Sequence, residues 1–306
     1  MRFCFRRTAL FFLSVWVVNF PVLLPAADTA PPQSSGNDIN HVGDITSDAL
    51  VELSGLAASN LRPNILWAIN DGGDGAKLYA LDTNGDHLGT VRIINAVNHD
   101  WEDMASFVHD GTAYLLIADV GDNFSQREFC KIYVVKEPAV DPSKNGFNKT
   151  ATIAWQIRFR YEDGPRDCEA VAVDTLNRRI LLVSKRNVPV VLYELPLKPA
   201  QAGVDHISRR LTSIFNLTLP TGMDLSPNQS AAVILNYRRS YFFKRRDGEL
   251  WQRALGRAPQ AVEFPSLKQQ EAVCFSSDGK AIYIASEGTP TPLLRISLEK
   301  YFVDSK

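Results

Sequence analysis

Five short segments of this chain share one pattern, in which a polar residue precedes small and apolar residues that continue into a strand-like run. The segments start 48 to 52 residues apart, except for one interval of 67 residues. A period of about 40–50 residues, with several short strands in each unit, is typical of a β-propeller. The five segments are Ser54-Gly55-Leu56-Ala57, Glu102-Asp103-Met104-Ala105, Glu169-Ala170-Val171-Ala172, Thr221-Gly222-Met223-Asp224 and Glu271-Ala272-Val273-Cys274.

Each repeat divides into strand-like runs rich in Val, Ile, Leu and aromatic residues, with Asp, Asn or Gly residues between them. In the fourth repeat we expect the outermost strand at residues 249–253. The last repeat has only three runs, and residues 41–53 are predicted to supply its outermost strand and so close the ring. The sequence predicts an all-β fold, a five-bladed β-propeller. A six-bladed propeller is the alternative if the 67-residue interval contains an extra half-blade.

The N-terminal residues have the composition of a secretory signal peptide. Three arginines precede an almost wholly apolar run, and small residues follow it. A membrane anchor is the competing interpretation, but the apolar run is shorter than the roughly 18 residues that a span needs. We predict a signal peptide at residues 1–27, a flexible tether at residues 28–42 and a single β-propeller domain at residues 43–306. The mature protein would then be secreted, either periplasmic or extracellular.

The charge balance and the cysteine content exclude several classes of partner and site. Loss of the three leader arginines leaves 30 basic against 34 acidic residues, a near-neutral balance that argues against nucleic acid as a general partner. Cys130, Cys168 and Cys274 are odd in number and widely spaced, so they predict neither a disulfide framework nor a zinc site. We expect them to be small buried residues, and the mature protein to be a monomer without a membrane span.

The leading polar residue of each repeat is a candidate metal ligand. In a propeller these five residues would reach the same height around one axis and form a ring of oxygens: Ser54, Glu102, Glu169, Thr221 and Glu271. Three carboxylates in a protein interior repel one another unless a cation lies between them. Hard oxygen ligands without His or Cys favour calcium, with magnesium as the alternative. Asp100 and Asp167, each two residues before a ring glutamate, would form a second layer behind the ring or cap the turn.

Simpler interpretations of this ring stay open. The ion would only plug and rigidify the channel, or the acids would pair with basic residues of neighbouring loops without a metal. These basic residues are Lys185, Arg186, Arg238 and Arg239. If they instead surround a bound cation, they would suit a small anionic ligand such as a phosphoester. The candidate catalytic base is then Asp71, Asp122 or Glu287.

Several further segments, spread over nearly the whole mature chain, form a distinctive set. They are Asn70-Asp71-Gly72-Gly73, Asp100-Trp101-Glu102-Asp103-Met104-Ala105, Asp119-Val120-Gly121-Asp122-Asn123, Tyr161-Glu162-Asp163-Gly164-Pro165, Asp167-Cys168-Glu169-Ala170, Thr221-Gly222-Met223-Asp224-Leu225-Ser226-Pro227 and Gln270-Glu271-Ala272-Val273. This set resembles a widespread group of secreted bacterial β-propellers. The resemblance implies the fold and the secretion, but no established activity.

The order Ser, Glu, Glu, Thr, Glu at near-equal spacing resembles a second family, the calcium-activated nucleotidases or soluble apyrases. The resemblance implies a five-bladed propeller with one calcium ion held in the channel by the five ring residues. Thr221 stands where that family has serine, which keeps the hydroxyl. The nucleotide-contacting residues of the family have no clear counterparts here. A looser similarity to phytase-like and esterase-like propellers rests on Asp-x-Glu segments.

Two functions follow from these observations. Because no complete catalytic set is visible, we expect a binding module with an axial calcium ion and a polar face. Its partner would be a small anionic ligand or an extracellular protein. The alternative is an enzyme, a calcium-dependent phosphoester or phosphoanhydride hydrolase of the apyrase-like or phytase-like kind.

Overall fold

Apolar runs separated by polar turns fold into strands throughout residues 38–303, the part of the chain that the computed structural model describes. The described residues form an all-β fold. Their helices are two short ones of four residues each, α1 (Trp251–Ala254) and α2 (Glu299–Phe302). The predicted signal peptide and most of the predicted tether lie outside the described residues.

The strands form five units of four antiparallel neighbours, one unit for each sequence repeat. Unit 1 contains β2 (Leu53–Ala58), β3 (Ile65–Asn70), β4 (Lys77–Asp82) and β5 (His87–Ile94). Unit 2 contains β6 (Trp101–His109), β7 (Thr112–Asp119), β8 (Cys130–Lys136) and β9 (Phe147–Tyr161). Unit 3 contains β10 (Cys168–Asp174), β11 (Arg179–Ser184), β12 (Val190–Pro196) and β13 (His206–Ile214). Unit 4 contains β14 (Pro220–Leu225), β15 (Ala231–Asn236), β16 (Ser240–Lys244) and β17 (Gln260–Val262). Unit 5 contains β18 (Gln270–Phe275), β19 (Ala281–Ser286), β20 (Thr291–Ser297) and β1 (Ile39–Ile45).

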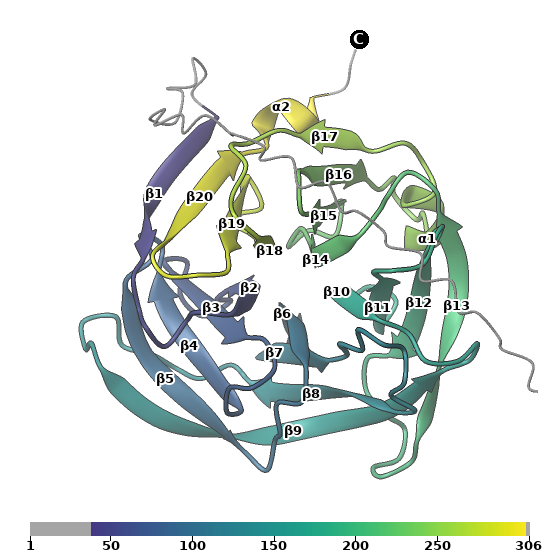
Figure 1. Ribbon diagram of the computed structural model, residues 1–306, viewed down its shortest axis with the longest axis horizontal. Coiled ribbons are helices and arrows are strands. Elements are labelled where there is room, and N and C mark those ends of the chain that lie inside the picture. The colour runs from purple at the N-terminus through teal and green to yellow at the C-terminus, as the bar shows by residue number, and fades with distance from the viewer. Residues whose placement is uncertain (1–37, 304–306) are drawn as a thin grey trace, which may run out of the picture. The chain divides into compact units, whose positions relative to one another are not determined.

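The first strand of each unit faces the centre of the arrangement, as Figure 1 shows for β2, β6, β10, β14 and β18. Each of these inner strands contacts the inner strands of both neighbouring units, and β18 contacts β2, so the contacts form a closed cycle. The inner strands are buried over nearly their whole length. Their side chains are therefore packed within the fold.

An N-terminal strand completes the last unit, as the sequence predicts, but it spans Ile39–Ile45 rather than residues 41–53. Strand β1 pairs antiparallel with β20, from Ile39 opposite Ile296 to Ile45 opposite Thr291. The boundary of the predicted tether is wrong, because residues 39–42 belong to this strand. The side chain of Ile45 is fully buried, so the strand contributes to the core as well as pairing with β20.

The interval of 67 residues contains four strands, the same number as the other repeats. Its additional length lies in the connections of unit 2 and in β9, which is 15 residues long. The first half of β9 pairs in parallel with β5, and its end pairs in parallel with β13. The outer edges of units 1, 2 and 3 are thus joined by backbone hydrogen bonds.

The predicted strand at residues 249–253 is wrong. Helix α1 lies there instead, and the outermost strand of unit 4 is β17, which pairs with β16. Trp251 and Ala254 are both buried, and their spacing of three residues puts them on one face of the single helical turn. An alternating strand would have pointed these two side chains to opposite faces.

Large side chains fill the space between neighbouring units. Trp67 and Trp101 are fully buried in one such layer, and the ring of Tyr133 lies 6.2 Å from that of Trp101. The three predicted buried cysteines, Cys130, Cys168 and Cys274, are indeed buried and free. Apolar packing between the units holds the described residues together without disulfides.

Candidate functional site

A β-bulge marks the start of every inner strand, and the bulged residue is the same one in each unit. The antiparallel register skips one residue between Leu53 and Gly55, and it does so at the equivalent place in the other four units. The skipped residues are Ser54, Glu102, Glu169, Thr221 and Glu271. A bulge leaves its residue outside the ladder and re-aims the side chain. The repeated polar position therefore has one local backbone environment in all five units.

A second set of equivalent residues follows the second strand of each unit. The backbone amide of Asp71 donates to Glu52 O at 2.8 Å, two residues before the bulge at Ser54. Lys185 donates in the same way to Asp167 O at 2.9 Å. By register, the equivalent residues are Asp71, Val120, Lys185, Tyr237 and Glu287. Side chains from two rings of positions thus meet at the same end of the inner strands.

Two groups of carboxylates lie at this end, and Glu102 belongs to both. Oxygens of Asp71, Asp100 and Glu102 lie within 4.8 Å of one another, and so do oxygens of Glu102, Asp167 and Glu169. The structure brings together two of the three predicted ring glutamates. It places Asp100 and Asp167 in the same groups rather than in a layer behind them.

The third ring glutamate is connected to this cluster through a basic residue and a tyrosine. Lys185 is buried and forms an ion pair with the carboxylate of Glu169. Its Nζ also donates to the hydroxyl of Tyr237 at 2.7 Å, and that hydroxyl donates to Glu271 Oε1 at 3.0 Å. Gln269 Nε2 donates to the same oxygen at 3.2 Å. One buried ammonium therefore lies between two ring acids.

The two ring hydroxyls connect neighbouring units. Ser54 Oγ donates to Trp101 O at 3.0 Å, and Thr221 Oγ1 donates to Gln270 O at 3.1 Å. In both cases the acceptor is the residue immediately before the next ring glutamate. Each hydroxyl proton is committed to a backbone carbonyl, but the oxygen keeps lone pairs that can bind a cation.

Burial and mutual repulsion make these carboxyl groups weak acids. Burial raises the pKa of Glu102 well above its usual range, and the charges of Glu169, Asp71 and Asp100 add to the effect. Burial raises the pKa of Asp71 to about 7. It raises the pKa of Glu169 to about 8, against the opposing charge of Lys185. Acids so close together either hold protons or share a cation.

Glu287 belongs to the same acidic network. Burial, together with its hydrogen bond to Glu271, raises the pKa of the Glu287 carboxyl to about 9. Asp71 also lines a pocket of about 520 Å³ together with Glu52 and Asp74. Two of the three predicted catalytic acids, Asp71 and Glu287, therefore lie in the acidic network, and Asp71 also borders an open pocket.

Asp122, the third predicted catalytic acid, holds its own loop together. Its carboxylate accepts hydrogen bonds of 2.8 Å from the backbone amides of Gln126 and Arg127. Its own amide donates to Asp167 Oδ1 at 3.0 Å. Both carboxylate oxygens are thus engaged in folding the segment between β7 and β8.

The predicted basic residues do not gather around an open anion site. Arg186 Nε lies 2.6 Å from Asp167 Oδ2, so it neutralises an acid of the cluster. Arg239 forms an ion pair of 3.2 Å with Glu263, and Arg238 is exposed. With Lys185 bound to Glu169, two of the four basic residues compensate acids of the cluster.

Gly121 allows the backbone to approach the acids closely. A Cβ atom at this position would overlap Glu102 Oε1 and lie 2.5 Å from Asp100 Oδ2. Only a residue without a side chain leaves room for both carboxylates. The glycine in the segment Asp119-Val120-Gly121-Asp122-Asn123 is therefore explained by the lack of space for a side chain beside the two carboxylates.

Sequence reasoning missed three polar residues of the inner strands and their adjoining loops: Asp103, Asp224 and Tyr237. Tyr237 could have been found, because it occupies the position after the second strand that Lys185 occupies in unit 3. Asp103 and Asp224 are the only acids inside the five repeated segments apart from the leading glutamates. Asp103 is fully buried, and its carboxylate accepts backbone hydrogen bonds from two other units, at Val171 and Met223.

Comparison with known proteins adds little to this geometry. No family model matches the sequence, and no curated protein matches it. Among solved structures, the fold is similar to the crystal structure of the major Malassezia sympodialis allergen Mala s 1. The TM-score is 0.47 with 10% identity, over 84% of this chain and 78% of that chain. At this level the similarity supports no argument about function. Neither helix in the described part of the chain has the length and apolar character needed to cross a membrane.

Proposed function

We propose that this chain is a secreted, five-bladed β-propeller that binds a calcium ion at the acidic end of its channel and works as a binding module. The observation that carries the proposal is the position of Glu102, whose carboxylate belongs to both acidic groups. A cation bound in either group would have Glu102 and two further carboxylates as ligands. Five units with inner strands in a closed cycle support the blade count.

The donor set fits calcium. Calcium takes six to eight oxygen ligands in irregular geometry, whereas magnesium demands a near-octahedral set and keeps several waters. The cluster offers carboxylates from unequal positions, together with the hydroxyl oxygens of Ser54 and Thr221 on the same ring. Without a cation, the excess of acids over Lys185 and Arg186 leaves Glu102 buried among like charges. A bound divalent ion would remove that repulsion.

The arrangement favours binding over catalysis. Asp122 is engaged in its own loop, and the two basic residues nearest the acids are engaged in ion pairs. An anionic substrate would have to compete with the carboxylates for Lys185 and Arg186. The polar face around the acidic ring is therefore better suited to a partner that is recruited through the bound cation.

A calcium-dependent phosphoester hydrolase is the second candidate, because Asp71 joins the acidic group and the pocket of about 520 Å³. A calcium ion, when bound, would supply charge stabilisation for a phosphoryl oxygen. With its pKa near 7, the Asp71 carboxyl could exchange a proton with water in the pocket at neutral pH. Lys77, which pairs with Asp74 at 2.7 Å, is the basic side chain that lines this pocket and could contact a phosphate.

Calorimetric titration of the purified protein with calcium tests the proposal, using Glu102→Gln as the variant. The wild type should bind calcium and melt at a higher temperature with calcium than with a chelator. Glu102→Gln should weaken calcium binding about tenfold or more, because the shared ligand of both groups loses its charge. Glu263→Gln, an exposed glutamate paired with Arg239, is the matched control and should bind like the wild type.

The result that would overturn the proposal is equal melting with calcium and with chelator, together with no bound metal by elemental measurement. The hydrolase candidate is tested separately with nucleotides, phytate and simple phosphoesters. It requires phosphate release that depends on calcium and is lost in Asp71→Asn. Calcium binding without any phosphate release would favour the binding module.

A further inference from the structure

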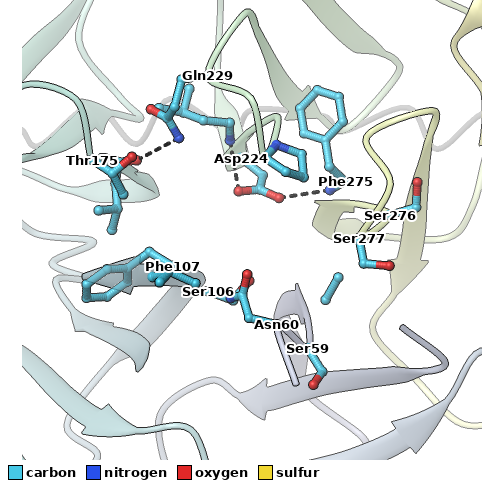
Figure 2. Close-up of a pocket in the computed structure, with 15 residues that line it drawn as sticks. Ser59, Asn60, Ser106, Phe107, Thr175, Asp224, Gln229, Phe275, Ser276 and Ser277 are labelled. Carbon is cyan, nitrogen blue, oxygen red and sulfur yellow. Dashed lines mark hydrogen bonds between the residues drawn. The ribbon is translucent and has the colours of Figure 1, made fainter. Parts of the chain in front are cut away.

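The carboxylate of Glu102 is buried without a partner. The residue is 4% exposed, and among residues 38–303 no hydrogen bond or ion pair reaches its side-chain oxygens. Asp224, at the opposite end of an inner strand, shows the contrasting arrangement. Its oxygens accept hydrogen bonds of 2.8 Å from the backbone amides of Leu225 and Phe275, and Figure 2 shows the bond from Phe275. A buried carboxylate that no donor reaches is stabilised by a proton or by a cation.

The two carboxylate groups that share Glu102 come from different pairs of units. The first group is Asp71, Asp100 and Glu102, from units 1 and 2, and the second group is Glu102, Asp167 and Glu169, from units 2 and 3. The second group already contains two bases. Lys185 pairs with Glu169, and Arg186 Nε lies 2.6 Å from Asp167 Oδ2. Three carboxylates and two bases leave the second group with one net negative charge.

The first group contains no base. Neither of its aspartates forms an ion pair with another described residue. The basic side chains of the adjoining loops are engaged with other acids: Lys77 pairs with Asp74 at 2.7 Å, and Arg127 pairs with Asp119 at 2.6 Å. The three negative charges of the first group are therefore uncompensated, and a divalent cation is attracted more strongly to this group than to the second.

Two glycines leave space beside the first group. A Cβ atom at Gly72 would lie 3.0 Å from Asp100 Oδ1, and one at Gly121 would lie 2.5 Å from Asp100 Oδ2. Both glycines are the second residue after the second strand of their unit, and Arg186 is the equivalent residue of unit 3. The same backbone position therefore leaves room beside the first group and supplies a base to the second.

A pocket reaches the first group from outside. Asp71 and Gly72 line the pocket of about 520 Å³, and no acid of the second group does. Calcium takes six to eight oxygen ligands, more than three carboxylates supply if each gives one oxygen. Water from the pocket would complete the set, and the pocket offers the ion a path to the carboxylates.

We propose that the calcium ion binds in the first group, between units 1 and 2, with Asp71, Asp100 and Glu102 as its protein ligands. Lys185 and Arg186 are the built-in cations of the second group and keep the ion out of it. This inference rests on the proposed function and specifies its site. The other members of the repeated ring then support the channel without binding the ion: Ser54, Glu169, Thr221 and Glu271.

Asp100→Asn and Asp167→Asn are a matched pair of variants, because each aspartate precedes a ring glutamate by two residues and belongs to one group only. Calorimetric titration with calcium chloride compares them with the wild type. Asp100→Asn should weaken calcium binding about tenfold or more, since a charged ligand is lost. Asp167→Asn should weaken it about threefold or less, since only a more distant charge is lost. Asp71→Asn should behave like Asp100→Asn and replaces it if that variant does not fold.

A double variant covers the case in which Asp167→Asn does not fold because Arg186 loses its partner. Lys185→Met with Glu169→Gln removes a whole ion pair and leaves the net charge unchanged. It should bind calcium within about threefold of the wild type, because the first group keeps all its acids. Thermal melting of each variant in chelator shows whether it is folded before calcium is added.

Two results would overturn the assignment while the proposed function stands. One is a loss of calcium affinity in Asp167→Asn, or in the folded double variant, as large as that in Asp100→Asn. The other is wild-type affinity in both Asp71→Asn and Asp100→Asn. A wild type that binds no calcium would overturn the assignment and the proposed function together.

Discussion

The carboxylate of Asp103 accepts a hydrogen bond of 2.7 Å from the backbone amide of Val171, which belongs to the neighbouring unit. The same oxygen accepts from Met223 N at 3.1 Å, one unit further on, and the other oxygen accepts from Met104 N at 2.8 Å. One fully buried side chain thus joins the inner strands β6, β10 and β14.

Replacing Asp103 by alanine should destabilise the whole ring. The change leaves three buried amides without an acceptor, at about 1–3 kcal/mol each. We expect the free energy of unfolding, measured by urea titration, to fall by at least about 3 kcal/mol. A typical surface substitution changes it by less than about 0.5 kcal/mol. Asp103→Asn keeps one acceptor oxygen and should cost less. Asp86→Ala, at an exposed position, is the control, and a loss for Asp103→Ala no larger than that of this control would contradict the prediction.

The ion pair between Lys185 and Glu169 should be strongly coupled in the absence of a divalent cation. Lys185→Met in chelator leaves a buried acid without its base, a change that typically costs about 3–5 kcal/mol. Adding Glu169→Gln should recover part of that loss, with a coupling energy of at least about 1 kcal/mol in a double-mutant cycle. The exposed pair Lys144 and Asp141, 3.9 Å apart, should show no measurable coupling, because solvent screens it. Equal coupling in the two cycles would refute a buried role for Lys185.

The stability of the wild type relative to Asp224→Asn should depend on pH. Burial raises the pKa of Asp224 to about 7, so the folded state holds a proton that the unfolded chain releases near pH 4. The stabilising effect of that proton is complete below about pH 4 and is lost as pH rises through 7. Denaturation at several pH values should show the wild type losing stability against the variant over this range. A constant difference from pH 4 to pH 8 would mean that Asp224 titrates normally.

Deletion of strand β1 should open the last unit. A chain that begins at Thr46 lacks the partner of β20 and the buried side chain of Ile45. We expect it to melt about 10 °C or more below a chain that begins at Asp38, since each kcal/mol lost shifts the melting temperature by about 2–4 °C at this size. Scanning calorimetry of the two chains compares them directly, and coincident transitions would show that β1 contributes nothing.

Gly121→Ala should impair cation binding through geometry alone. The added Cβ would displace the carboxylates of Glu102 or Asp100 without changing any charge. Calcium affinity should fall about tenfold or more, as it does when groups that support ligands are moved. Gly75→Ala, where the new atom would meet only the flexible end of Lys77, is the control. Unchanged affinity in Gly121→Ala would place the cation elsewhere.

The sequence predicted the all-β fold and most strands because inner and middle strands are continuous apolar runs bounded by turn residues. It also predicted that an N-terminal segment completes the last sheet, since a missing strand in a repeat is visible by counting. The strand predicted at residues 249–253 failed because five residues are too few to distinguish the period of a strand from one helical turn. In the structure Trp251 and Ala254 are both buried on one face of the helical turn.

The repeated polar positions could be read from the sequence, but their surroundings could not. Bulge formation depends on the register between two strands, which no single segment encodes, and the bulge gives Glu102 and Glu169 the same backbone setting. The partners of these acids come from other segments of the chain: Lys185 is 16 residues from Glu169, and Tyr237 is 34 residues from Glu271. Only the tertiary structure decides that Lys185 lies against Glu169, that Tyr237 reaches Glu271, and that Asp103 joins three strands. Local sequence determined the strands of this protein, whereas long-range packing determined the electrostatics of its channel.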